Sequence, residues 1–170
     1  FVLECDVKIA PGGNSGIQFR SHVRDNGRLF GYQCEIDSSE TWICGAIYDE
    51  ARRGWLEDLR DENENLAREA FVQGEWNHYR IKAQGNRLQT WINGVACSDI
   101  RDDVDAAGLI AFQVHGGDAT DVRWKNIVIT DLPPAPFIHS VSDISQQFSF
   151  YMDGRFFTQY IKGDGADVRN

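Results

Sequence analysis

The sequence predicts an all-β fold, a β-sandwich or jelly roll, for most of the 170-residue chain. Three observations support this prediction. Apolar and polar residues alternate in short runs, Asn-Gly and Gly-Asn pairs separate several of these runs, and apolar patterns of helix length are scarce. A chain of this size is long enough to bury a complete core.

The first three predicted strands are VLECDVKIA (2–10), GIQFRSHV (16–23) and LFGYQCEID (29–37). A Pro-Gly-Gly-Asn-Ser-Gly segment at 11–16 ends the first strand, and Asn26-Gly27 lies between the other two. Asn-Gly between two alternating runs predicts a hairpin, because both residues tolerate positive φ.

The next predicted strands are NHYRIKAQ (77–84), RLQTWI (87–92), VACSDI (95–100), LIAFQVH (109–115) and VRWKNIVITDL (122–132). Prolines at 133, 134 and 136 then break the pattern, so we expect the sandwich domain to span residues 1–132. Residues 133–170 are expected to form a linker and a β-hairpin around Asp153-Gly154. This hairpin either packs back on the sandwich or begins another module.

The segment ARRGWLEDLRDENENLAREA at 51–70 departs from the strand pattern, because it is densely charged and has sparse apolar anchors such as Trp55, Leu59 and Leu66. It is predicted to be a short exposed insertion with one or two helical turns. Two interpretations stay open. The segment is either a solvated surface or a flap over a binding face, with Trp55 as a contact.

The chain is acidic, with 26 Asp and Glu against 17 Lys and Arg and a net charge of −9. No basic cluster is present that would neutralise phosphates, so nucleic acids and anionic membranes are not expected partners. No apolar run approaches the ~20 residues that a membrane span needs. Oligosaccharides or glycosides remain suitable partners, since aromatic faces and hydrogen bonds recognise neutral sugars.

The four cysteines are Cys5, Cys34, Cys44 and Cys97, and their spacing matches no zinc-binding pattern. They are predicted to be small core residues. A Cys34–Cys44 disulfide across a hairpin is left open.

Strand phase places a polar set on one face of the predicted sheet, because successive side chains point to opposite sides. The set comprises Gln18, Arg20, Gln33, Glu35, Asp37, Gln113 and His115, with Trp91 as a neighbour that phase allows. These types supply a cation, carboxylates, amides, an imidazole and a stacking surface, which is typical of a sugar site. The alternative is a solvated outer face on which a histidine merely ends a strand.

Six ordered segments carry a family resemblance: GNSGIQFR, GYQCEID, GAIYD, GEWNHYRIKAQGNRLQTWINGV, GLIAFQVHGG and VRWKNIVI. They resemble the 3-keto-disaccharide hydrolase domain family over approximately residues 1–132. The resemblance implies a concanavalin A-like jelly roll with the site on its concave sheet. It also implies action on sugars oxidised at C3 and a periplasmic or secreted bacterial protein.

Two departures from the family pattern bear on these expectations. The family usually has further β structure before the strand that begins here at Phe1, so N-terminal strands are expected to be missing. The charged segment 51–70 is also longer than the usual connection, which affects the mouth of the expected site.

On a 3-keto-glycoside the ketone acidifies the C2 proton, so one base can remove it and the C1 substituent can leave by elimination, with hydration afterwards. We predict His115 as the base, Arg20 as the group that stabilises the enolate oxygen, and Glu35 or Asp37 as an acid or orienting partner. The predicted substrate contacts are Gln18, Gln33, Tyr48, Trp91 and Gln113. No cofactor is assigned, but a divalent metal ion held by Glu35, Asp37 and His115 is an alternative way to polarise the ketone.

Other interpretations use the same residues differently. A two-carboxylate glycosidase would use Glu35 and Asp37, although two carboxylates on one strand face are poorly placed to flank a sugar. A non-catalytic, lectin-like carbohydrate-binding module would stack sugars on Tyr48, Trp55 and Trp91. A third alternative is an interaction domain that only positions a neighbour in a larger polypeptide. The oligomeric state is left open.

Overall fold

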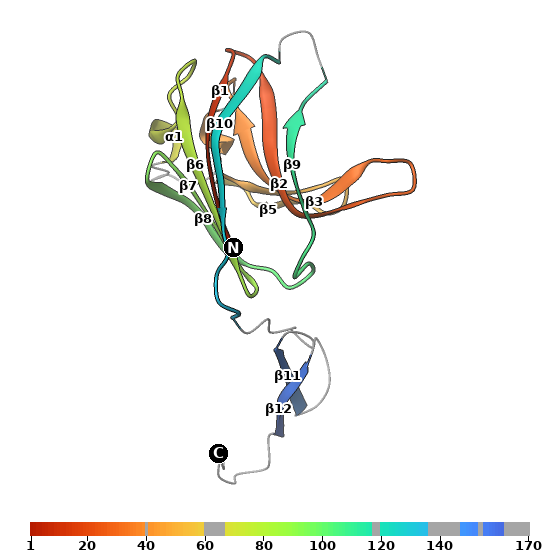
Figure 1. Cartoon of the computed structure of the whole chain (residues 1–170). Coiled ribbons are helices and arrows are strands. Elements are labelled where there is room, and N and C mark those ends of the chain that lie inside the picture. The colour runs from red at the N-terminus through yellow and green to blue at the C-terminus, as the bar shows by residue number, and fades with distance from the viewer. Residues whose placement is uncertain (40, 60–66, 117–119, 136–146, 153–154, 162–170) are drawn as a thin grey trace.

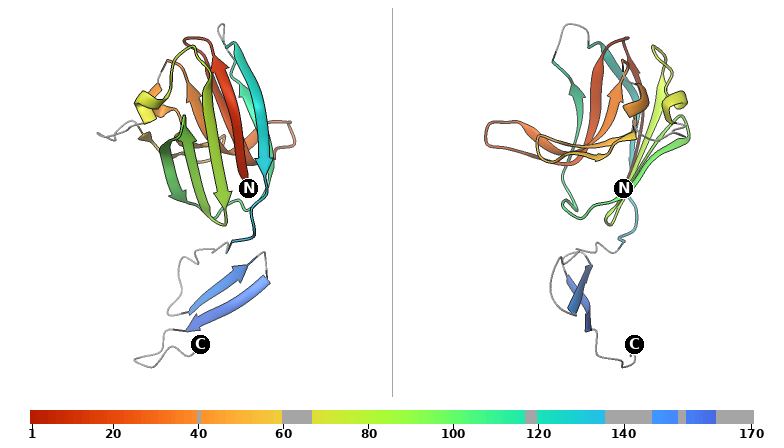
Figure 2. Two further views of the ribbon diagram at one scale, coloured as in Figure 1. Left: turned by 60° about the vertical axis from the view of Figure 1, so that its left-hand side comes forward. Right: turned by 180° about the vertical axis from the view of Figure 1, so that it is seen from behind.

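The computed structural model describes residues 1–39, 41–59, 67–116, 120–135, 147–152 and 155–161. Its main body is a sandwich of two five-stranded sheets in which neighbouring strands are antiparallel (Figure 1). Figure 2 shows the two layers from two further directions. The predicted all-β, jelly-roll class is confirmed.

The back sheet has the strand order β10-β1-β6-β7-β8. Its strands are β1 (Val2–Ile9), β6 (Asn77–Gln84), β7 (Arg87–Ile92), β8 (Val95–Arg101) and β10 (Val122–Thr130). Asn93 and Gly94 join β7 to β8 with φ values of 49° and 84°. These are the positive angles that an Asn-Gly hairpin turn requires.

The front sheet has the strand order β5-β4-β3-β2-β9. Its strands are β2 (Asn14–Val23), β3 (Leu29–Asp37), β4 (Ile47–Glu50), β5 (Gly54–Glu57) and β9 (Leu109–Val114). The 3₁₀ turn η1 (Thr41–Ile43) and the helical turn α1 (Ala67–Ala70) lie in connections. Because β2 pairs with both β3 and β9, segments from distant parts of the chain lie side by side in this sheet.

The core fills the space between the two sheets. Its fully buried side chains include Leu3, Ile9, Ile17, Phe19, Tyr32, Ile36, Ile47, Tyr79, Ile81, Leu88 and Ile92. Burying an aliphatic side chain of this size stabilises the fold by roughly 1.5–3 kcal/mol relative to leaving it exposed. The apolar phase of the predicted strands therefore points inward in both sheets.

All four cysteines are free, so the disulfide left open between Cys34 and Cys44 does not form. Cys5, Cys34 and Cys44 are buried in the core. Burial raises the pKa of the Cys44 thiol to about 12. These residues act as small core side chains, as the sequence predicted.

The first part of the charged segment is not the exposed insertion that the sequence predicted. Residues 54–57 form β5, which pairs with β4 at the edge of the front sheet, and Leu59 is fully buried. So short a strand shows too little alternation to be recognised. The helical turn α1 agrees with the expectation of one or two helical turns. Residues 60–66, including Leu66, lie outside the described residues.

Strands β11 (Gln147–Met152) and β12 (Arg155–Ile161) form a separate two-stranded antiparallel sheet. This is the hairpin expected from the sequence, and its turn at Asp153-Gly154 lies outside the described residues. In the part of the chain that the structure describes, no helix has the length and apolar character to cross a bilayer.

Candidate functional site

Two adjoining hollows lie on the outer face of the front sheet, opposite to the core. The larger, about 290 Å³, is lined by Asn14, Gln33, Glu35, Ile43, Tyr48, Glu50, Trp55, Gln113 and His115. The smaller, about 240 Å³, is lined by Gln18, Arg28, Leu29, Glu50, Ala111, Phe112 and Gln113. Because they share Glu50 and Gln113, we treat them as one site and call it the front groove.

Most of the predicted site residues line the front groove, namely Gln18, Gln33, Glu35, Tyr48, Gln113 and His115. Strand register explains why they meet. Gln33 on β3 lies opposite Gln18 on one side and Tyr48 on the other. In the next row, Gly16 on β2 lies between Glu35 and Gln113. Three strands thus present their polar phase to the same hollow.

A chain of side-chain hydrogen bonds runs along the floor of the groove. Gln18 Nε2 donates to Gln33 Oε1 at 3.1 Å. Gln33 Nε2 donates to Glu35 Oε1 at 2.8 Å and, more weakly, to Gln113 Oε1 at 3.5 Å. Gln18 and Gln33 are both buried, so these bonds hold the amides in place away from bulk water.

Glu35 is a carboxyl group almost fully withdrawn from water, with only 5% of its surface exposed. Burial raises its pKa to about 7; the nearby Glu50 and Asp37 carboxylates act in the same direction, and the Gln33 donor opposes them. A carboxyl group that titrates near neutrality can both accept and return a proton. Glu35 is therefore the strongest acid–base candidate in the groove.

An aromatic pair forms the wall of the groove beyond Gln33. The rings of Tyr48 on β4 and Trp55 on β5 meet edge to face, with their centroids 4.9 Å apart and an interplanar angle of 69°. Both side chains are partly exposed and line the larger hollow. They offer a surface on which a sugar ring can stack, a role that the sequence analysis gave to Tyr48 and, in one interpretation, to Trp55.

His115 lies at the rim, directly after the end of β9. It is exposed, and its Nδ1 lies 2.8 Å from the carbonyl oxygen of Gly116. A Cβ atom at Gly116, the next residue, would meet no atom within 4 Å. His115 thus reaches the groove from its edge, whereas Glu35 lies in its floor.

Asp37 supports the end of β3. Its Oδ2 accepts a hydrogen bond from Asn14 Nδ2 at 3.0 Å, and its Oδ1 accepts from the backbone N–H and the hydroxyl of Ser39 at 2.7 and 2.6 Å. These contacts define an Asx turn. Asp37 contributes negative charge near Glu35 but does not line either hollow.

The structure does not assemble the metal site considered as an alternative. Among the described residues, no group of three or more His, Cys, Asp and Glu side chains is placed to hold a metal ion. Glu35, Asp37 and His115 share a sheet face but do not converge as ligands.

Arg20 does not face the groove, contrary to the strand-phase prediction. Its φ is 48°, and β2 shifts register against both β3 and β9 at this point. A bulge of this kind redirects the side chain. Arg20 Nη1 instead donates to the carbonyl oxygens of Gly85, in the β6–β7 turn of the back sheet, at 2.8 Å and of Asp105 at 3.1 Å. The predicted contact between Arg20 and a substrate oxygen lacks geometric support.

Trp91 does not lie near the groove either. It belongs to β7 of the back sheet, where the guanidinium of Arg80 lies 4.7 Å from its ring centroid. Strand phase indicates on which side of a strand a residue lies, but not to which sheet the strand belongs. That is why the sequence wrongly grouped Trp91 with the polar face.

The sequence analysis also missed several groove residues, namely Asn14, Arg28, Ile43 and Glu50. A signal existed for Glu50, which follows Tyr48 by two positions in IYDE and therefore shares its face. Arg28 and Ile43 lie in turns, where no strand periodicity indicates the face on which a side chain lies.

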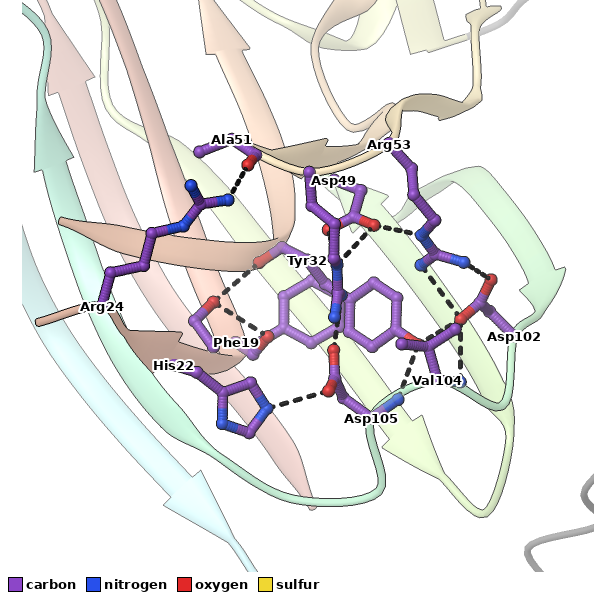
Figure 3. Close-up of polar contacts among 12 residues, drawn as sticks. Phe19, His22, Arg24, Tyr32, Asp49, Ala51, Arg53, Asp102, Val104 and Asp105 are labelled. Atoms are coloured by element: carbon purple, nitrogen blue, oxygen red, sulfur yellow. Dashed lines mark hydrogen bonds and ion pairs between the residues drawn. The ribbon is translucent and has the colours of Figure 1, made fainter.

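A second group of charges, gathered around the buried Asp49, lies on the core side of the front sheet and is shown in Figure 3. We call it the ion-pair cluster; its members are Asp49, Arg52, Arg53, Asp102 and Asp105. Asp49 is fully buried and accepts hydrogen bonds from Arg52, at 2.9 Å, and from Arg53. Arg52 also pairs with Asp105 at 2.5 Å, and Arg53 with Asp102 at 2.8 Å. The cluster ties the β4–β5 turn to the connection between β8 and β9.

A comparison with the sequence models of protein families identifies the kind of domain. The sequence model of one family, described as the 3-keto-alpha-glucoside-1,2-lyase-like domain, matches residues 1–130. No curated protein matches the chain.

Similar solved structures include the carbohydrate-binding module CBM66 from Bacillus subtilis, with a TM-score of 0.53 and 17% identity over 75% of this chain and 72% of that chain. A protein designated a candidate glycosyl hydrolase from Parabacteroides distasonis gives a TM-score of 0.46 and 20% identity over 74% and 75% of the two chains. At 17% identity, the likeness to CBM66 supports the fold alone.

Proposed function

Since the chain belongs to the 3-keto-alpha-glucoside-1,2-lyase-like domain family over residues 1–130, we propose that it cleaves glycosides whose sugar carries a ketone at C3. The bond between C1 and the leaving oxygen breaks by elimination across C1 and C2, and water then adds to C1. The substrate is a 3-keto-disaccharide or a related 3-keto-glycoside, bound in the front groove.

The reaction needs one base and one proton donor. The base removes the C2 proton, and the electron pair of that C–H bond passes into the ketone as an enolate. Collapse of the enolate forms the C1–C2 double bond and expels the C1 oxygen, which takes up a proton. Water adds across the double bond in the second stage and returns a proton to C2.

One observation carries the proposal, namely the position and state of Glu35. It is a buried carboxyl in the groove floor whose pKa lies at about 7, so half of it is ionised near neutral pH. This is the property that a base must have if it takes a carbon-bound proton and later returns it. We therefore assign the base to Glu35 in place of His115, which is exposed at the rim.

The remaining groove residues suit the other tasks. Gln113 accepts from Gln33 on its Oε1, which leaves its Nε2 group to donate to the enolate oxygen in the place first given to Arg20. His115 is the proton donor to the departing oxygen at the open edge. Tyr48 and Trp55 stack on a sugar ring and fix its orientation.

The test is turnover of a nitrophenyl 3-keto-glucoside carrying deuterium at C2. We expect nitrophenol release, a primary isotope effect and transfer of the label to solvent. Glu35→Gln should lower kcat/KM by at least about 100-fold, the range of a lost acid–base group. Glu4→Gln, a carboxylate on the outer face of the back sheet, is the matched control and should keep wild-type turnover.

Other outcomes identify the competing functions. Hydrolysis of the ordinary glucoside without loss of the C2 label would indicate a two-carboxylate glycosidase. Binding of unoxidised glycans together with no turnover of any 3-keto-glycoside would indicate a carbohydrate-binding module. Either result would refute the elimination proposal.

A further inference from the structure

Gln33 is the central residue of the groove floor. Its amide contacts Gln18 on β2, Glu35 on its own strand and Gln113 on β9, and only 2% of the residue is exposed. Its side chain thus links the three neighbouring strands β2, β3 and β9. Its orientation therefore affects every polar group around it.

Gly16 provides the space in which Gln33 lies. A Cβ atom at Gly16 would come within 2.5 Å of Gln33 Cδ, 2.6 Å of Cγ and 2.7 Å of Nε2. The backbone of Gly16 does not adopt the left-handed region, so an alanine there would be opposed by this contact and not by its φ angle, and Gln33 would have to move. The side chain of Gln33 thus occupies the space that a Cβ atom at Gly16 would need.

The hydrogen-bond directions suit an ionised Glu35. Gln33 gives its N–H groups to Glu35 and Gln113 and accepts from Gln18, while Gln18 Oε1 is buried and has no partner among the described residues. A protonated Glu35 has a hydroxyl to donate and so needs an acceptor. Gln33 Nε2 offers no acceptor to that hydroxyl, so the amide in this orientation favours the carboxylate.

We infer that Gln33, held over Gly16, is a positioning residue that orients the Glu35 carboxyl and favours its ionised form through the amide donor. The catalytic meaning of this inference rests on the proposed function, because it concerns the group assigned as the base. Among the described residues, the charged and titratable groups that face Glu35 are Glu50 and Tyr48 from β4, Asp37 from its own strand and His115 beyond β9. Arg28 pairs with Glu50 at 3.0 Å and moderates that charge.

The experiment measures the titration of Glu35 directly. The carboxyl ¹³C signal of Glu35 is assigned by its loss in Glu35→Gln and followed from pH 4 to 10 in the full chain. In Gln33→Leu we expect the midpoint to rise by about one pH unit, because the carboxylate loses its amide donor. Gly16→Ala should shift the midpoint in the same direction, because it displaces Gln33 without changing its chemistry.

Two further variants exclude a merely structural effect. The double variant Gly16→Ala/Gln33→Leu should shift the midpoint no further than Gln33→Leu, since Gly16 acts through Gln33. Gln89→Leu removes an amide that donates to the Asp99 carboxylate at 3.1 Å on the back sheet, and it should leave the Glu35 midpoint unchanged.

The ascending limb of the pH–rate profile should move with the midpoint in Gln33→Leu. An unmoved midpoint in a folded Gln33→Leu protein overturns the inference, even if the wild type turns over 3-keto-glycosides. A moved midpoint in a protein without such turnover keeps the positioning role and rejects the proposed function. If Gly16→Ala fails to fold, Gln33→Leu alone decides.

Discussion

The front groove and the ion-pair cluster lie on opposite faces of the front sheet, and both contain buried carboxylates. In the groove, burial raises the pKa of Glu35 to about 7, because one amide donor is not enough to offset desolvation. In the cluster, burial would also raise the pKa of Asp102, but hydrogen bonds from Arg53, Tyr32 and Val104 outweigh it and lower the pKa. The partners of a buried acid, more than its depth, decide whether it stabilises the fold or remains available for proton transfer.

The largest expected effect concerns the stability supplied by the cluster. Asp49→Asn removes the fully buried carboxylate that Arg52 and Arg53 share, so we expect the free energy of unfolding to fall by about 3 kcal/mol. Urea unfolding at pH 7 measures this change. Asp99→Asn removes the partner of Arg87 from an exposed ion pair and should change stability little. Equal losses in the two variants would contradict the assignment of the cluster as structural.

Glu35→Gln tests the other side of the comparison through the pH dependence of stability. The folded protein holds the Glu35 proton up to about pH 7, whereas the unfolded chain releases it near 4.5, so the free energy of unfolding falls as the pH rises through this window. The fall attributable to Glu35 is roughly 2–3 kcal/mol. Relative to the wild type, Glu35→Gln should therefore gain stability between pH 5 and pH 8.

Urea titrations of both proteins at the two pH values measure this difference, and a constant difference would mean that Glu35 ionises freely. The contribution of Asp102 to stability depends on pH in the opposite direction. Its lowered pKa stabilises the fold above its unfolded value near 3.8, and this contribution is lost as the pH falls through the folded pKa.

The fold was largely predictable because the sequence patterns that specify its strands and turns lie within short stretches of the chain. Alternating runs joined by Asn-Gly or Gly-Asn specify hairpins without reference to the rest of the chain. Strand phase likewise placed Gln18, Gln33, Glu35 and Gln113 on one face. The strand β5 escaped prediction because GWLE is short and lies within a charged segment.

The remainder of the site depends on long-range packing that no local pattern contains. A bulge turned Arg20 toward the Gly85 carbonyl, and the sheet to which β7 belongs removed Trp91 from the groove. The preference for Glu35 over His115 as the base follows from burial by neighbouring strands. The ion-pair cluster joins Arg52 and Arg53 to Asp105 and Asp102, about 50 residues away in the sequence, and only the folded chain reveals this contact.

Two tryptophans differ in the same way, because one faces the groove and the other packs against a neighbouring side chain. The smallest effects on KM and stability are expected for these two residues. Trp55 lies open to the groove beside Tyr48, whereas Trp91 is covered by the Arg80 guanidinium. Trp55→Ala should raise KM for a 3-keto-glycoside about 10-fold with little change in kcat, because it removes a stacking surface that binds substrate and transition state alike. Trp91→Ala should leave KM unchanged and cost about 0.5–1 kcal/mol of stability through the lost cation–π contact. Steady-state kinetics and thermal unfolding of both variants measure these effects, and a higher KM in Trp91→Ala would show that the back sheet takes part in binding.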